Sequence, residues 1–121
     1  MASQAKKFRV KAIERMQQLA SIDFIGSDLK RPECVLAHSS GVLIVPDWTD
    51  GGGVSLVLPD GRTIRHLAKD RMADNPLRPN GIALEQRGSI LLAHLGDETG
   101  GVFRLLPDGS TETVIDTLEG K

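Results

Sequence analysis

The feature that most constrains this chain is an internal repeat that covers most of its length. The runs Gly52–Val54 and Leu58–Gly61 return as Gly100–Val102 and Leu106–Gly109, at an offset of 48 residues for every position. Matching residues at a fixed period of this size indicate one supersecondary unit built twice. The chain is therefore expected to fold as two copies of the same structure.

The repeat continues upstream of these runs at an offset of 47, so one residue is gained in a loop of the second copy. The matching pairs are Arg31-Pro32 with Arg78-Pro79, Glu33 with Asn80, Val35 with Ile82, and Gly41 with Gly88. We take the two units to be residues 31–70 and 78–118.

Each unit is composed of short runs typical of β-strands. Those of the first unit are apolar or alternating and rich in Val, Ile, Leu and Thr; they are Val35 to His38, Val42 to Val45, Val54 to Leu58 and Thr63 to Leu67. Pro59-Asp60-Gly61 and Pro107-Asp108-Gly109 predict hairpin turns, because Pro presets a negative φ and Gly accepts a positive one.

Four antiparallel strands in about 45 residues is the dimension of a β-propeller blade. The sequence thus predicts an all-β chain with about two four-stranded blades, and a pair of unrelated β-meanders is the alternative. Propellers close with about four to eight blades, so two units cannot close a ring by themselves. We expect such a chain to expose apolar surface and to self-associate.

The first 20 residues differ from the rest in charge. They carry five basic residues against one acid, and apolar residues recur at helical spacing, which predicts a short amphipathic helix over 4–19. An organelle presequence, a surface-binding helix, and a helix or arm packed on the main domain all fit this pattern. We separate residues 1–20, a basic helix or arm, from a partial propeller over 21–121.

The overall composition excludes several classes of partner. Fifteen Lys and Arg against 16 Asp and Glu leave a net charge of −1, so neither nucleic acid nor a membrane surface is expected as a partner. No apolar run is long enough to span a bilayer. The single cysteine, Cys34, has no internal disulfide partner, and we expect a cytoplasmic protein with Cys34 as an inert thiol.

Four segments resemble the start of the gluconolactonase, senescence marker protein 30 and luciferin-regenerating enzyme family. They are Leu29–Val35, Leu77–Leu84, Leu91–Asp97 and Gly100–Leu105, and the resemblance covers residues 23 to 121. It implies a six-bladed propeller that holds one divalent metal, calcium or zinc, and hydrolyses lactones or related cyclic esters. It also implies that this chain corresponds to the first third of such a protein, and is inactive alone.

The resemblance places Glu33 where the family has a metal-binding Glu, with the other ligands beyond Lys121. From the residues alone, Glu33 follows an X-Pro step and is expected to open the innermost strand, where a carboxylate suits a hard cation. Asn80 holds the equivalent position and is the candidate to bind substrate, for example a sugar-acid-like lactone; the alternative is that Asn80-Gly81 only turns the chain. A propeller that binds without catalysis, or a self-assembling two-blade fragment, is the rival to the hydrolase.

Overall fold

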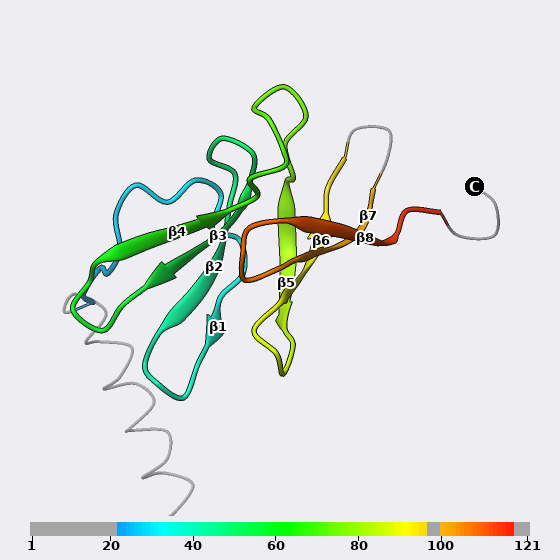
Figure 1. Cartoon of the computed structure of the whole chain (residues 1–121). Helices are drawn as coiled ribbons and strands as arrows, with labels where there is room; N and C mark the ends of the chain where they lie inside the picture. Colours follow the sequence, from blue (N-terminus) through cyan, green and yellow to red (C-terminus); the bar gives the residue numbers. More distant parts are fainter. Residues whose placement is uncertain (1–21, 97–99, 118–121) are drawn as a thin grey trace, which may run out of the picture.

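The computed structural model describes residues 22–96 and 100–117, and it folds them into two four-stranded antiparallel sheets (Figure 1). The first sheet has the order β1-β2-β3-β4 and the second the order β5-β6-β7-β8. The strands are β1 (Leu36–Ala37), β2 (Leu43–Asp47), β3 (Gly53–Val57), β4 (Thr63–Leu67), β5 (Pro79–Leu84), β6 (Ile90–His94), β7 (Gly101–Leu105) and β8 (Thr111–Ile115).

The prediction of an all-β chain with two four-stranded antiparallel sheets is confirmed, and three of the four strands keep the offsets of the repeat. β2 and β6 begin 47 residues apart, whereas β3 and β7, and β4 and β8, begin 48 apart. The predicted helix over residues 4–19 lies outside the described residues. No helix in the described ranges is long and apolar enough to cross a membrane.

The innermost strands are where the two sheets differ. β1 contains only two residues, Leu36 and Ala37, and Glu33 lies three residues before it, so Glu33 does not open this strand as we expected. β5 pairs with β6 back to Pro79 through an irregularity between Pro79 and Ile82. Such a bulge adds unpaired residues to one strand and lets the pairing extend further along the chain.

The predicted Pro-Asp-Gly hairpins are present in both sheets. Gly61 and Gly109 have φ of 89° and 90°, a conformation that glycine adopts without steric cost. In the first turn the N–H of Gly61 donates to the carbonyl of Leu58 at 2.8 Å, and in the second Gly109 donates to Leu106 at 2.9 Å. The repeated sequence thus produces the same turn twice.

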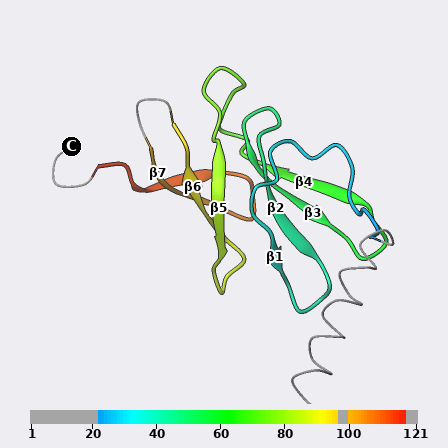
Figure 2. The ribbon, with the colours of Figure 1, turned by 180° about the vertical axis from the view of Figure 1, so that it is seen from behind.

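The two sheets stack front to back. Ile44 and Val54 of the first sheet belong to the same buried cluster as Leu92 and Phe103 of the second. At the repeat offset of 47, the counterpart of Ile44 is Leu91, but the second sheet packs with Leu92. Neighbouring residues of a strand point to opposite faces, so the two sheets meet through opposite faces of the repeated unit. In Figures 1 and 2, β2 and β5 lie side by side at this junction.

The backbone of a glycine run closes the junction between the sheets. Leu77, fully buried, donates its N–H to the carbonyl of Gly51, and Ala68 donates to Gly52, both at 2.8 Å. A Cβ at Gly52 would lie 1.8 Å from the carbonyl oxygen of Leu77, and Gly52 has a φ of 77°. Only glycine allows the two backbones to approach this closely.

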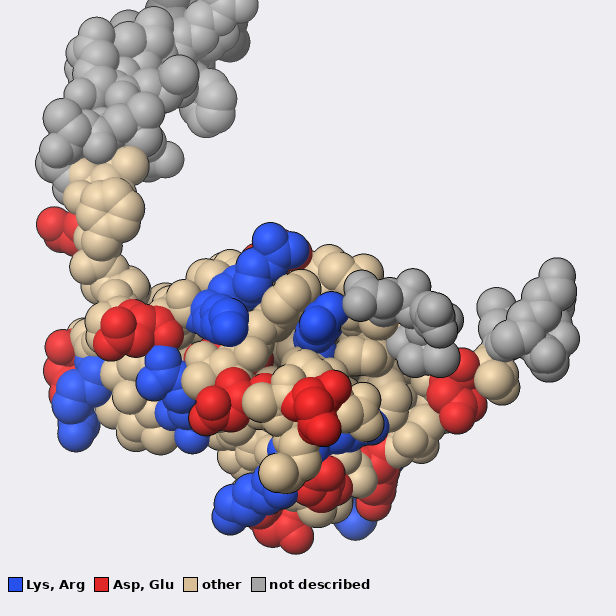
Figure 3. Space-filling view, turned by 90° about the horizontal axis from the view of Figure 1, so that it is seen from above, with Lys and Arg blue, Asp and Glu red and all other residues tan. Residues whose placement is uncertain are grey.

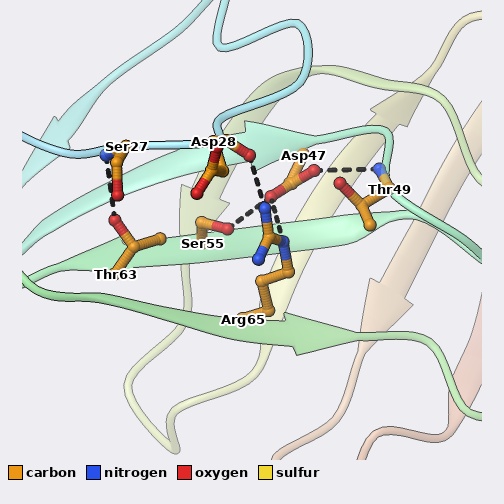
Figure 4. Close-up of polar contacts among 7 residues, drawn as sticks. All are labelled: Ser27, Asp28, Asp47, Thr49, Ser55, Thr63 and Arg65. Atoms are coloured by element: carbon orange, nitrogen blue, oxygen red, sulfur yellow. Dashed lines mark hydrogen bonds and ion pairs between the residues drawn. The ribbon is translucent and has the colours of Figure 1, made fainter.

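A polar network lies on the face of the first sheet that points away from the second sheet (Figure 4). The buried Asp47 accepts hydrogen bonds from the hydroxyl of Ser55 at 2.5 Å and the N–H of Thr49 at 2.8 Å, and its carboxylate lies 3.4 Å from Nε of Arg65. Arg65 also donates to the carbonyl of Asp28. Through this bond the segment 22–30 is attached to the face of the first sheet that points away from the second.

The outward face of the second sheet carries a charged group instead. Arg104 pairs with Glu85 at 2.6 Å and with Glu112 at 3.0 Å. By the repeat, Arg104 and Glu112 replace Leu56 and Ile64 of the first sheet, where Leu56 packs against the buried core. Arg104 therefore occupies the position of Leu56, which packs against the core between the sheets one unit earlier, whereas Ile64, the counterpart of Glu112, is exposed.

Candidate functional site

The residues predicted for a site lie where three loops meet, which we call the loop face: residues 30–33, 48–52 and 71–80. Two backbone hydrogen bonds join these loops, from Trp48 to the carbonyl of Lys30 at 2.9 Å and from Leu77 to that of Gly51 at 2.8 Å. Figure 3 looks onto the molecule from above and shows Lys and Arg side chains gathered toward the middle of this view, with acidic side chains around them.

Glu33 is an exposed residue paired with a neighbour. Its carboxylate lies 2.7 Å from the guanidinium of Arg31, and the two side chains are 37% and 52% exposed. Its N–H donates to the carbonyl of Arg31 at 2.9 Å, and Arg31 has a φ of 61°. A tight turn of the backbone thus holds this ion pair at the loop face.

Asn80 lies in β5, at the bulge opposite β6, and its side chain is exposed. Neither Asn80 nor Gly81 has a positive φ. The left-handed conformation that the alternative invokes for Asn80 is therefore absent, and both residues lie in the first half of β5. The exposed amide is available to a ligand at the loop face.

His94 ends β6 beside the loop face, as Asp47 ends β2. Its Nδ1 accepts the N–H of Arg78 at 3.0 Å, and its ring lies edge to face with Phe103 at a centroid distance of 5.4 Å. Burial lowers the pKa of His94 below its usual value, and the charges of Arg71 and Arg78 lower it further. A neutral ring with Nδ1 unprotonated satisfies this contact.

The remaining reactive side chains have structural contacts. The Nδ1 of His38 is hydrogen-bonded to the hydroxyl of Ser40 at 2.7 Å, and the ring of His66 bridges to the carbonyl of Leu106 in the other sheet at 2.9 Å. Cys34 is a free, half-buried thiol.

Trp48 is the residue of this face that the sequence did not single out. The guanidinium of Arg31 lies 4.7 Å from the centre of its ring and that of Arg78 lies 5.7 Å away, distances typical of cation–π contacts. The indole N–H donates to the carbonyl of Pro79 at 2.9 Å. The sequence carries no signal of this cluster, because its three residues lie far apart along the chain.

A divalent metal has few ligands in the described ranges. No three His, Cys, Asp or Glu side chains in residues 22–96 and 100–117 gather closely enough to hold one. Calcium takes about six to eight oxygen ligands and structural zinc about four ligands, so the single carboxylate of Glu33 does not make a site. The described residues alone thus do not fit the metal that the family resemblance implies.

Comparisons of this chain with protein-family models, with curated proteins and with solved structures give no match. The assignment of a function therefore depends on the repeat, the stacking of the sheets and the loop face.

Proposed function

We propose that this chain supplies two consecutive blades of a β-propeller hydrolase of the gluconolactonase type. The observation that supports this proposal is the front-to-back stacking of two equivalent four-stranded sheets. In this arrangement each unit meets its two neighbours with opposite faces, so a further unit can add on the outward face of the second sheet, where it packs on Arg104 and Glu112, until a ring closes. Two unrelated meanders would not be expected to match strand for strand and also to stack front to back.

In this proposal the loop face becomes one part of the mouth of the central channel. Glu33 contributes one charged oxygen to a divalent cation, calcium or zinc, and other blades contribute the remaining ligands. Exposed ion pairs such as Glu33–Arg31 contribute about 0–1 kcal/mol, so exchange of Arg31 for a cation costs little. Asn80 binds a hydroxyl of the lactone or of a sugar-acid-like substrate.

A propeller that binds ligands without catalysis is the second candidate. It is favoured by the contrast within the loop face: Arg31, Trp48 and Arg78 form an ordered cluster, whereas Glu33 belongs to no group of three potential metal ligands among the described residues. This candidate requires the same ring but no metal at Glu33.

The test combines metal titration by calorimetry with lactone hydrolysis. Sedimentation velocity first identifies the assembled species, because the single chain is expected to self-associate and to hydrolyse no lactone. In a complete protein that carries this chain, Glu33→Gln should weaken metal binding and activity together, with partial rescue by excess metal and with folding retained. Asn80→Ala should raise KM or lower kcat while metal binding persists.

Glu112→Gln is the matched control, since Glu112 is also an exposed glutamate paired with an arginine, at 3.0 Å, but on the outward face of the second sheet. It should leave metal affinity unchanged. Unchanged metal affinity in Glu33→Gln would remove this residue from the site and favour the scaffold. A monomeric chain that hydrolyses lactones would contradict the proposed assembly.

A further inference from the structure

A groove of about 420 Å³ opens beside Trp48 on the loop face, and the metal proposal does not use it. Its walls come from three parts of the chain: Lys30 before the first sheet, Trp48 and Asp50 after β2, and Ala73, Pro76 and Arg78 before β5. This volume is within the usual range for small-molecule sites, about 300–1,000 Å³. The groove therefore has room for a compact ligand.

The aromatic wall of the groove is fixed in place before any ligand binds. Trp48 donates its indole N–H to Pro79 and its backbone N–H to Lys30, both at 2.9 Å, and two guanidinium groups lie against its ring. A preorganised wall lowers the entropy cost of binding. The indole, Ala73 and Pro76 together offer apolar surface to a ligand.

The charged groups of the groove favour one kind of anion. Lys30 and Arg78 supply an ammonium and a guanidinium, and the five N–H donors of an arginine let Arg78 bind a ligand while it keeps other contacts. Asp50 adds a negative charge to the same walls. A carboxylate with one charge suits this combination better than a phosphate dianion, which Asp50 would repel more strongly.

We propose that this groove binds a small monoanionic carboxylate with a compact apolar body. The carboxylate is bonded by Lys30 and Arg78, and the apolar body lies against Trp48 and Pro76. The proposal is independent of metal binding at Glu33 and of lactone hydrolysis, so either can fail without the other.

Fluorescence of the full chain can test the proposal directly. Trp48 is the sole tryptophan and the chain has no tyrosine, so its emission reports on one wall of the groove. The probes are cyclohexanecarboxylate, the neutral cyclohexylmethanol of nearly the same shape, and inorganic phosphate. We expect a saturable change in emission with the carboxylate, and an affinity at least about tenfold lower for the other two probes.

Variants separate the groove from a general effect of charge. Arg78→Gln should weaken carboxylate binding about tenfold. The double variant Lys30→Gln/Arg78→Gln should show no saturable binding. The control is Arg87→Gln, at an exposed arginine of another turn, and it should leave carboxylate binding unchanged. Circular dichroism checks that each variant is folded. No saturable change, equal affinity for the alcohol, tighter binding of phosphate, or unchanged affinity in the folded double variant would each overturn the proposal.

Discussion

The two sheets share one backbone plan but fill equivalent positions with opposite chemistry. In the first sheet, Asp47 at the end of β2 is buried in a network with Ser55 and Arg65. In the second, the positions of Asp47 and Ser55 are occupied by His94 and Phe103, which pack edge to face. A carboxylate network has been replaced by an aromatic pair while the strand bounds keep their offsets.

What covers each surface accounts for the difference. The surface around Asp47 faces the segment 22–30, which provides a carbonyl at Asp28 for Arg65 to bind. The surface around Phe103 faces the first sheet and joins its apolar cluster of Ile44 and Val54. The repeat therefore specifies the backbone, whereas the neighbouring element decides which side chains can be buried.

The largest expected effect concerns the glycines immediately before β3 and β7, Gly52 and Gly100. Gly52→Ala would place a Cβ 1.8 Å from the carbonyl oxygen of Leu77 at a positive φ, and should lower the free energy of unfolding by more than about 3 kcal/mol. At the repeat partner Gly100, the closest atom to a Cβ is the carbonyl oxygen of His94 at 3.4 Å. Gly100→Ala should change stability by less than about 1 kcal/mol.

Urea unfolding of both variants measures this contrast. Equal losses of unfolding free energy in Gly52→Ala and Gly100→Ala would show that the backbone approach at Gly52 is no closer than that at Gly100. The proposed difference between the two sheets at this position would then be wrong.

A smaller loss is expected from removal of the buried carboxylate. Asp47→Ala leaves the hydroxyl of Ser55 and the N–H of Thr49 without their acceptor and Arg65 without its charge partner, and should cost about 2–4 kcal/mol. The control is Asp60→Ala. Asp60 also accepts the N–H of the residue two positions on and lies beside an arginine, but it is exposed.

The urea midpoint should fall clearly for Asp47→Ala and only slightly for Asp60→Ala. A similar, small shift in both would mean that burial adds nothing to the Asp47 network, contrary to the role that we assign to the segment 22–30.

Much of the fold could be predicted from the sequence because the repeat constrains strands and turns together. The predicted strand from Thr63 to Leu67 has the bounds that the structure gives β4, and the glycines of both Pro-Asp-Gly turns have positive φ. The shortness of β1 could not be predicted, since residues before Leu36 follow the same pattern as residues that pair in β5. Pairing there depends on a bulge, which is a tertiary feature.

The site was less predictable, because its contacts join residues from different loops. Glu33 and Asn80 were singled out as repeat partners and both lie on the loop face, yet the ion pair of Glu33 with Arg31 was not foreseen. Trp48 has no aromatic neighbour along the chain, so the sequence gives no sign of a cluster around it. Its partners are cations, and Arg78 reaches it only through the packing of the second unit on the first.

The charged outward face of the second sheet extends the same comparison. Arg104 holds the pKa of Glu85 below its usual value through a direct hydrogen bond, so this carboxylate stays ionised to a lower pH than an ordinary glutamate. The equivalent of Arg104 in the first sheet, Leu56, packs against the core between the sheets. A further sheet that packs on this face must therefore accommodate charges that the first junction does not contain.

The smallest expected effect is a pH dependence that comes from His94 in the second sheet. Because the folded state lowers the pKa of His94 below its ordinary value of 6.5, the unfolded chain binds more protons near and below pH 6.5, and stability falls as the pH drops through this range. His94→Asn keeps an acceptor for the N–H of Arg78 but does not titrate, so its urea midpoint should fall less between pH 7 and pH 5. The unsubstituted chain, measured in parallel, defines the full slope. If His94→Asn kept that slope as well, the aromatic pair would have no part in the acid sensitivity, and the burial of a neutral ring would not distinguish the two sheets.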